Sequence, residues 1–179
     1  MVDRYAHCTF CGARFTVGQP WPRRCGACGE TSRLSPTPVA VALQPVGRGL
    51  LVVRRSLPPG PGEPALPAGY VAAGETWQQA TVRELDVASG LAADPLSVRL
   101  FDVVSAPDGT LLVFGVLPPV EALPEPRPDR EISGLGVLTE PAPLAFPPHT
   151  AAAERFLAGV AAPGAAAGVR SRRSGRPPS

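Results

Sequence analysis

The sequence predicts a mixed α/β domain with one helix against each face of a sheet, preceded by a small cysteine-rich module. Three observations support this fold class. β-rich segments precede and follow a helix-forming segment between Thr76 and Gly90. A second helix-forming segment, residues 150–160, closes the domain, and all four cysteines lie within the first 28 residues. A chain of 179 residues is long enough for one domain with an ordinary core and a short appendage.

The composition excludes several classes of protein. No apolar run approaches the roughly 18 residues that suggest a membrane span. The first ten residues contain no apolar signal-peptide segment, so a cytoplasmic location and no membrane partner are expected. The net charge is +2 and all 17 basic residues are arginine, a balance too weak to favour nucleic acid as a partner.

The cysteines form two C-x2-C pairs separated by thirteen residues: Cys8, Cys11, Cys25 and Cys28. Two-residue spacers let both thiolates of a pair face one ion, so the pattern predicts a zinc ribbon over residues 1–34. Four sulfur ligands leave no open position, which makes the expected zinc structural. A pair of disulfides is the alternative, although a reducing compartment does not favour it. The ribbon's mixed charges favour docking on protein over contact with nucleic acid.

The segments before the first helix predict strands and loops. Prolines 36 and 38 mark a linker, and the runs 39–43 and 50–54 flank a glycine turn at 47–49, which predicts a hairpin. Residues 57–65 hold four prolines and two glycines and are expected to form a loop. Residue 66 begins a short extended piece that leads to Gly69.

The first helix has clear signals at both ends. Thr76 can act as the N-cap, and Gln79 lies three residues on, which predicts a capping box. Gly90 is placed to end the helix.

The remaining elements follow in order. Runs 96–104 and 111–117 predict strands joined by a turn at Pro107-Asp108-Gly109, and residues 132–138 predict one more strand. The closing helix is expected at 150–160, so that the main domain covers residues 35–161. Small residues, prolines and arginines predict a disordered basic tail over 162–179.

Residues 69–91 resemble the signature of the Nudix hydrolase superfamily. Gly69 is followed after five residues by Glu75, after seven more by Arg83-Glu84-Leu85, and then by Gly90-Leu91. This spacing is similar to the Nudix box, G-x5-E-x7-R-E-U-x-E-E-x-G-U, in members that carry an N-terminal four-cysteine ribbon. The resemblance implies a Nudix-type α/β/α sandwich with a mixed sheet.

The resemblance also implies roles for individual residues. The carbonyl of Gly69 and the carboxylate of Glu84 would bind Mg²⁺ or Mn²⁺. Glu75 would orient Arg83 or act as an accessory base, and Arg83 would tie the loop to the helix by an ion pair. Glu131, with Asp129 close by, lies where some family members place a late catalytic glutamate.

The box departs from the family at two positions. The paired glutamates are replaced by Val87 and Ala88. On a helix these positions lie about 60° and 40° from Glu84, so carboxylates there would form one anionic patch. Asp86 lies about 160° from Glu84, on the solvent side, and is not expected to substitute. Mg²⁺ or Mn²⁺ is therefore expected to bind weakly, and Glu75, Arg83 and Glu84 can equally be an ion-pair scaffold in which Arg83 is an imperfect partner for Glu84.

Two functions are favoured over a third alternative, a purely structural or partner-binding ribbon protein. The first is a degenerate Nudix domain that binds a nucleoside diphosphate-linked ligand, with hydrolysis weak or lost. The second is an active metal-dependent hydrolase that cleaves a nucleoside diphosphate linked to another group, as in a dinucleotide, ADP-ribose or a nucleotide sugar. No S-Q-P-W-P-F-P-type signature follows the box, which argues against NADH as substrate. A homodimer also remains open.

Overall fold

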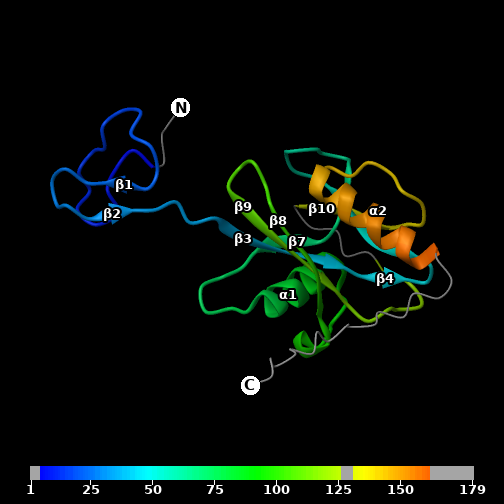
Figure 1. The fold of residues 1–179 in the computed structure, drawn as a ribbon. Helices are drawn as coiled ribbons and strands as arrows, with labels where there is room; N and C mark the ends of the chain where they lie inside the picture. The colour runs from blue at the N-terminus through cyan, green and yellow to red at the C-terminus, as the bar shows by residue number, and fades with distance from the viewer. Residues whose placement is uncertain (1–4, 126–130, 162–179) are drawn as a thin grey trace, which may run out of the picture.

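The computed structural model describes residues 5–125 and 131–161, which form a small N-terminal sheet and two larger sheets (Figure 1). The elements in chain order are β1 (Arg23–Arg24), β2 (Thr31–Ser32), β3 (Thr37–Leu43), β4 (Pro45–Val46), β5 (Gly49–Arg55), β6 (Pro64–Ala65), β7 (Ala68–Tyr70), α1 (Trp77–Ser89), the 3₁₀ turn η1 (Pro95–Ser97), β8 (Arg99–Ser105), β9 (Thr110–Val116), β10 (Ile132–Leu138) and α2 (Pro147–Ala161). The predicted tail, 162–179, and Asp129 lie outside the described residues.

One four-stranded sheet is mixed, which confirms the predicted fold class. Its order is β7-β3-β9-β8, with β3 antiparallel to β7 and parallel to β9. β8 and β9 form an antiparallel hairpin. The predicted turn at 107–109 closes this hairpin, with the Ala106 amide donating to the Thr110 carbonyl at 2.9 Å. β8 begins at Arg99, later than predicted, because residues 95–97 form η1 under an Asp94 cap.

The predicted hairpin between residues 39–43 and 50–54 is wrong. β3 pairs with β7 and β9, whereas β5 pairs with β4, β6 and β10 in the other sheet. The chain leaves the first sheet at Gln44, whose buried amide donates to the carbonyls of Pro45 and Pro118 at 2.9 and 2.8 Å. The glycine turn instead joins the two-residue strand β4 to β5. Both long runs are buried on two faces, so each occupies the interior of its own sheet.

Alternate residues of the central strands face different helices. Val41 and Leu43 of β3 belong to a buried cluster with Ala152 and Ala153 of α2. Ala42, between them, belongs to a second cluster with Leu85 of α1. Because side chains alternate along a strand, α1 and α2 must cover opposite faces, as Figure 1 shows.

The residues at the start of each helix explain where the helix begins. Thr76 and Gln79 form the predicted capping box of α1, and Gly90 ends the helix with φ +75°. α2 starts three residues earlier than predicted, at Pro147-Pro148. Proline suits the first turn of a helix, where its missing N–H is not needed.

The N-terminal module has its own small sheet and its own buried cluster. β1 and β2 pair antiparallel, and Phe15 packs with Cys8, Cys25 and Trp21. Figure 1 shows this module at one end of β3, apart from both helices. Among the described residues, neither helix has the length and apolar character that crossing a membrane requires.

Candidate functional site

Arg83 fastens the loop before α1 to the helix itself. Its Nε and Nη2 donate to Oε1 and Oε2 of Glu75, both at 2.8 Å, and Nη2 also donates to the Tyr70 carbonyl at 2.9 Å. The ion pair expected between Glu75 and Arg83 is therefore present. Nη1 pairs in addition with Oε1 of Glu84, so the expectation that Arg83 is an imperfect partner for Glu84 is wrong. The long arginine side chain turns back and reaches both carboxylates, although residues 83 and 84 leave the helix in different directions.

The charge state of Glu75 follows from this pairing. The Arg83 guanidinium, with help from the Ala72 amide, lowers the pKa of Glu75 to about 2. The two glutamates in turn raise the pKa of Arg83. A carboxylate held ionised so firmly is a weak proton acceptor near neutral pH, which favours a scaffold role for Glu75 over a role as base.

The Glu75→Gln variant is expected to lose about 1 kcal/mol of unfolding free energy at pH 7, a modest value because water screens the half-exposed guanidinium. The pKa of Glu75 is depressed in the folded protein, so its contribution is complete above the ordinary value of 4.5 and disappears as the pH falls toward 2. Urea denaturation should therefore show a gap between wild type and variant that narrows from pH 7 to pH 3. Glu154→Gln, at an exposed position of α2, is the control. A gap independent of pH would contradict the assignment.

Position 69 has no room for a side chain, so glycine is required there. A Cβ built on Gly69 would lie 2.1 Å from Cδ and from Oε1 of Glu84, and its φ is not in the left-handed region. The Glu84 carboxylate thus packs directly on the backbone of β7 and pairs with Arg83.

Gly69→Ala is expected to displace the Glu84 carboxylate from Arg83 and to lower the unfolding free energy by about 1–3 kcal/mol. Gly134→Ala in β10 is the matched control, because an added Cβ meets no atom within 4 Å there. Chemical denaturation measures both, and the control should change by less than about 0.5 kcal/mol. In a Gly69→Ala/Glu84→Ala protein, the loss of unfolding free energy should be smaller than the sum of the losses in the two single variants. Equal effects at Gly69 and Gly134 would refute the steric explanation.

A cleft of about 1020 Å³ lies beside this unit. Its walls come from β7, α1, the β8–β9 turn, the end of β5 and the start of α2. Its lining residues include Arg55, Gly69, Glu84, Val87, Ala88, Asp108, Glu131, Phe146 and His149. Gly69, Glu84 and Glu131 therefore line the same cleft. Glu75, Arg83 and Asp86 do not line it.

The two substituted box positions face this cleft. Val87 lines it with 57% of its surface exposed, and Ala88 lines it while 96% buried beside Leu85. Carboxylates at these positions would have stood next to Glu84. Within residues 5–125 and 131–161, only the four cysteines bring three or more metal-binding side chains close enough to share one ion. The described carboxylates of the cleft thus do not include three that lie close enough together to share one ion.

The four cysteines are positioned to bind one metal ion. All four sulfur atoms lie within 4.8 Å of one another, and none is in a disulfide. The Cys8–Cys28 and Cys11–Cys25 sulfur distances are both 3.7 Å. A tetrahedral zinc with bonds of about 2.3 Å places its sulfurs roughly 3.8 Å apart, so the geometry fits that ion. The amides of Cys11 and Phe10 lower the pKa of Cys8 to about 6, which favours the thiolate that a metal binds.

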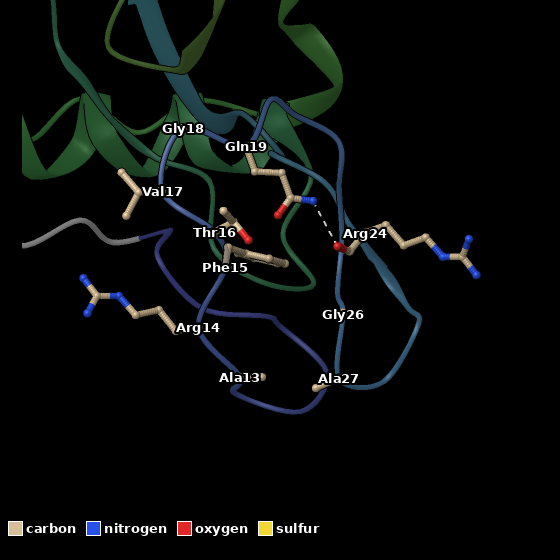
Figure 2. A pocket seen from close by; sticks show the side chains of 10 residues that line it. All are labelled: Ala13, Arg14, Phe15, Thr16, Val17, Gly18, Gln19, Arg24, Gly26 and Ala27. Carbon is tan, nitrogen blue, oxygen red and sulfur yellow. Dashed lines mark hydrogen bonds between the residues drawn. The ribbon is translucent and has the colours of Figure 1, made fainter.

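The N-terminal module also carries a shallow hollow of about 630 Å³, shown in Figure 2. The Gln19 amide crosses it to donate to the Arg24 carbonyl at 3.0 Å. Arg14 and Arg24 extend away from each other on opposite sides (Figure 2), so their charges do not converge on one ligand.

His149 and Arg55 were not identified from the sequence. His149 is 98% buried, and its Nδ1 accepts the Leu66 amide at 3.3 Å. Burial and the nearby charge of Arg55 lower the pKa of His149 to about 4, so the ring is neutral. The available signal is a histidine directly before a helix-forming segment and three residues after Phe146, which does not distinguish a ligand contact from an ordinary core position.

Comparison with known proteins identifies the main domain. A model of the NUDIX domain matches residues 34–160. A NUDIX hydrolase from Nitrosomonas europaea superposes with a TM-score of 0.63 at 22% identity, covering 85% of this chain and 90% of that one. A MutT NUDIX hydrolase from Burkholderia pseudomallei gives 0.55 at 24% identity, covering 67% and 97%. A bifunctional NMN adenylyltransferase/ADP ribose pyrophosphatase from Francisella tularensis, complexed with AMP and manganese, gives 0.50 at 25% identity, covering 58% and 34%. No curated protein sequence matches.

Proposed function

The chain belongs to the NUDIX family, and from this membership we propose that its cleft binds a nucleoside diphosphate-linked ligand with weak or no hydrolysis. The observation that carries the proposal is the pair Val87 and Ala88, which place apolar groups on the cleft wall where the family box has glutamates. Diphosphate cleavage needs divalent ions that neutralise phosphate oxygens and activate water. A single carboxylate, Glu84, already paired with Arg83, is a poor substitute for three.

A nucleotide-type ligand is supported by the shape and lining of the cleft. Its volume suits a ligand of nucleotide size, and apolar residues dominate its walls. The related Francisella tularensis protein was crystallised with AMP and manganese, at 25% identity to this chain. Without strong catalysis, such a domain would act as a sensor or as a regulatory module.

An active hydrolase is the second candidate, favoured by one observation. Glu131 lines the same cleft as Glu84, and its backbone is fixed there by the Ser56 amide, which donates to the Glu131 carbonyl at 2.8 Å. Two carboxylates can hold Mg²⁺ or Mn²⁺ when substrate phosphates supply further oxygen ligands.

The two candidates differ in turnover. Purified protein is incubated with Mg²⁺ or Mn²⁺ and a panel of ADP-ribose, NADH, dinucleoside polyphosphates and nucleoside triphosphates. We expect a rise in melting temperature with at least one of these compounds and little product. Product formation that disappears in Glu84→Gln would overturn the binding-only proposal and establish the hydrolase. If no compound gives either turnover or a thermal shift, both candidates are overturned.

We further propose that residues 1–34 form a structural zinc ribbon and residues 35–161 a separate Nudix unit. The distances among the four sulfur atoms and the separate buried cluster of the N-terminal module support this division. The scattered arginines of the ribbon favour docking on protein over nucleic-acid binding.

A further inference from the structure

One wall of the cleft carries three side chains that the Nudix box does not include. The guanidinium of Arg55 lies over the Phe146 ring, 4.9 Å from its centroid. The Phe146 ring lies 5.0 Å from the His149 ring. Arg55, Phe146 and His149 are therefore contiguous, and all three line the cleft. We call them the aromatic wall.

His149 presents one defined hydrogen-bond donor. Because Nδ1 accepts the Leu66 amide, the single proton of the neutral ring is on Nε2. Within the described part of the chain, Nε2 of His149 has no hydrogen-bond partner in the protein. Every fully buried side-chain nitrogen or oxygen atom in that part has such a partner, so Nε2 is not fully buried. Nε2 must therefore open onto the cleft that His149 lines.

The start of α2 is unsuited to a phosphate. Pro147 and Pro148 have no N–H, and the amides of His149 and Thr150 both donate to the Phe146 carbonyl, at 2.9 and 3.1 Å. The free amides that usually bind anions at a helix start are thus missing or used. Two nitrogens of Arg55 are also engaged: Nε donates to the Pro59 carbonyl at 2.8 Å, and Nη2 donates to the Leu57 carbonyl at 3.3 Å.

The wall therefore offers a flat guanidinium, an aromatic ring and a neutral donor, which suit a planar ring with hydrogen-bond acceptors. We propose that the aromatic wall binds the nucleobase of the ligand, with His149 Nε2–H donating to a ring nitrogen or carbonyl. Arg55, held by loop carbonyls and packed on Phe146, supplies a stacking surface. The proposal rests on the proposed function, in that it assumes a nucleotide-type ligand.

The test compares AMP with ribose 5-phosphate, which lacks the base, by isothermal titration calorimetry. His149→Asn retains an oxygen that can accept the Leu66 amide but removes the Nε2–H donor. We expect it to weaken AMP binding by about 2- to 10-fold, the effect of one hydrogen bond, and to leave ribose 5-phosphate unchanged. His149→Gln, whose amide can reach the Nε2 position, should recover part of the AMP affinity.

A parallel pair of variants tests the stacking surface. Arg55→Lys keeps the charge and removes the flat guanidinium, and it should weaken AMP binding selectively. Arg54→Lys, at an exposed neighbouring position that does not line the cleft, is the control and should bind AMP as the wild type does. In the unaltered protein, AMP should also shift the ¹H and ¹⁵N signals of His149 Nε2–H.

The outcomes separate this inference from the proposed function. If the wild type binds AMP but His149→Asn binds it equally well, the subsite is refuted and the proposed function stands. An equal loss of AMP and ribose 5-phosphate binding would assign the wall to phosphate and also refute the subsite. If the folded wild type binds no nucleotide, the proposed function and the subsite both fail.

Discussion

Replacing Val87 and Ala88 together by glutamate is expected to raise Mg²⁺-dependent hydrolysis by about 100-fold or more, the usual effect of restoring a metal ligand or base. Both positions line the cleft that holds Glu84, so the new carboxylates would complete an anionic patch on one face of α1. The rate of product release from the most stabilising compound of the panel, with and without Mg²⁺, measures the gain.

The two substitutions should differ in their cost to stability. Val87 is 57% exposed, so Val87→Glu should fold normally. Ala88 is only 4% exposed, so Ala88→Glu places a charge at a buried position and should lower the melting temperature in the absence of metal. Added Mg²⁺ should restore part of that loss in the double variant, because the ion stabilises only the folded state.

Val103→Glu is the matched control for this experiment. Val103 lies on β8, is 46% exposed and does not line the cleft, so the variant adds one carboxylate away from the site and matches the single variant Val87→Glu. It should change neither the rate nor the response to Mg²⁺. A folded double variant that is no faster than the wild type would show that the replaced glutamates do not limit catalysis.

Cys25→Ser is expected to abolish stoichiometric zinc binding and to unfold the N-terminal ribbon. The module buries too little apolar surface to fold alone, and structural zinc sites supply apparent binding energies of about 10–16 kcal/mol. Metal analysis should find one zinc per wild-type chain and none in the variant. The main domain should keep its melting temperature, because its two buried clusters do not include ribbon residues.

His7→Ala is the matched control for the zinc site. His7 precedes Cys8 but is not part of the group of four metal-binding side chains. The His7→Ala protein should therefore keep its zinc and its fold. A Cys25→Ser protein that retained zinc and an ordered ribbon would rule out a structural site formed by the four cysteines.

Local features were predicted well because they depend on residues a few positions apart. The capping box of Thr76 and Gln79, the end of α1 at Gly90 and the turn before Thr110 all form where expected. Each is closed by hydrogen bonds within the turn itself, so the neighbouring sequence is sufficient.

Strand pairing was predicted less well, and the reason lies in the core. The glycine turn after β4 was correctly identified, but its partner strand was not, because β3 and β5 are both apolar on two faces. Such runs carry no alternation that specifies a neighbour. The pairing is decided instead by contacts distant in the sequence: β3 pairs with β7 and β9, β5 pairs with β10, and the buried Gln44 amide binds the Pro45 and Pro118 carbonyls where the chain leaves the first sheet.

The sequence by itself indicated the family, the four-cysteine arrangement suited to a metal ion and the presence of Val87 and Ala88 at two positions of the box, because each is a matter of residue type at fixed spacing. Only the tertiary structure placed Val87 and Ala88 on the same cleft as Glu131, and Arg55 beside Phe146 and His149.

The tertiary structure also showed that one arginine, Arg83, pairs with both Glu75 and Glu84. These contacts join distant segments or depend on side-chain direction. They are fixed by the packing of sheets and helices around the shared core, which local spacing does not encode.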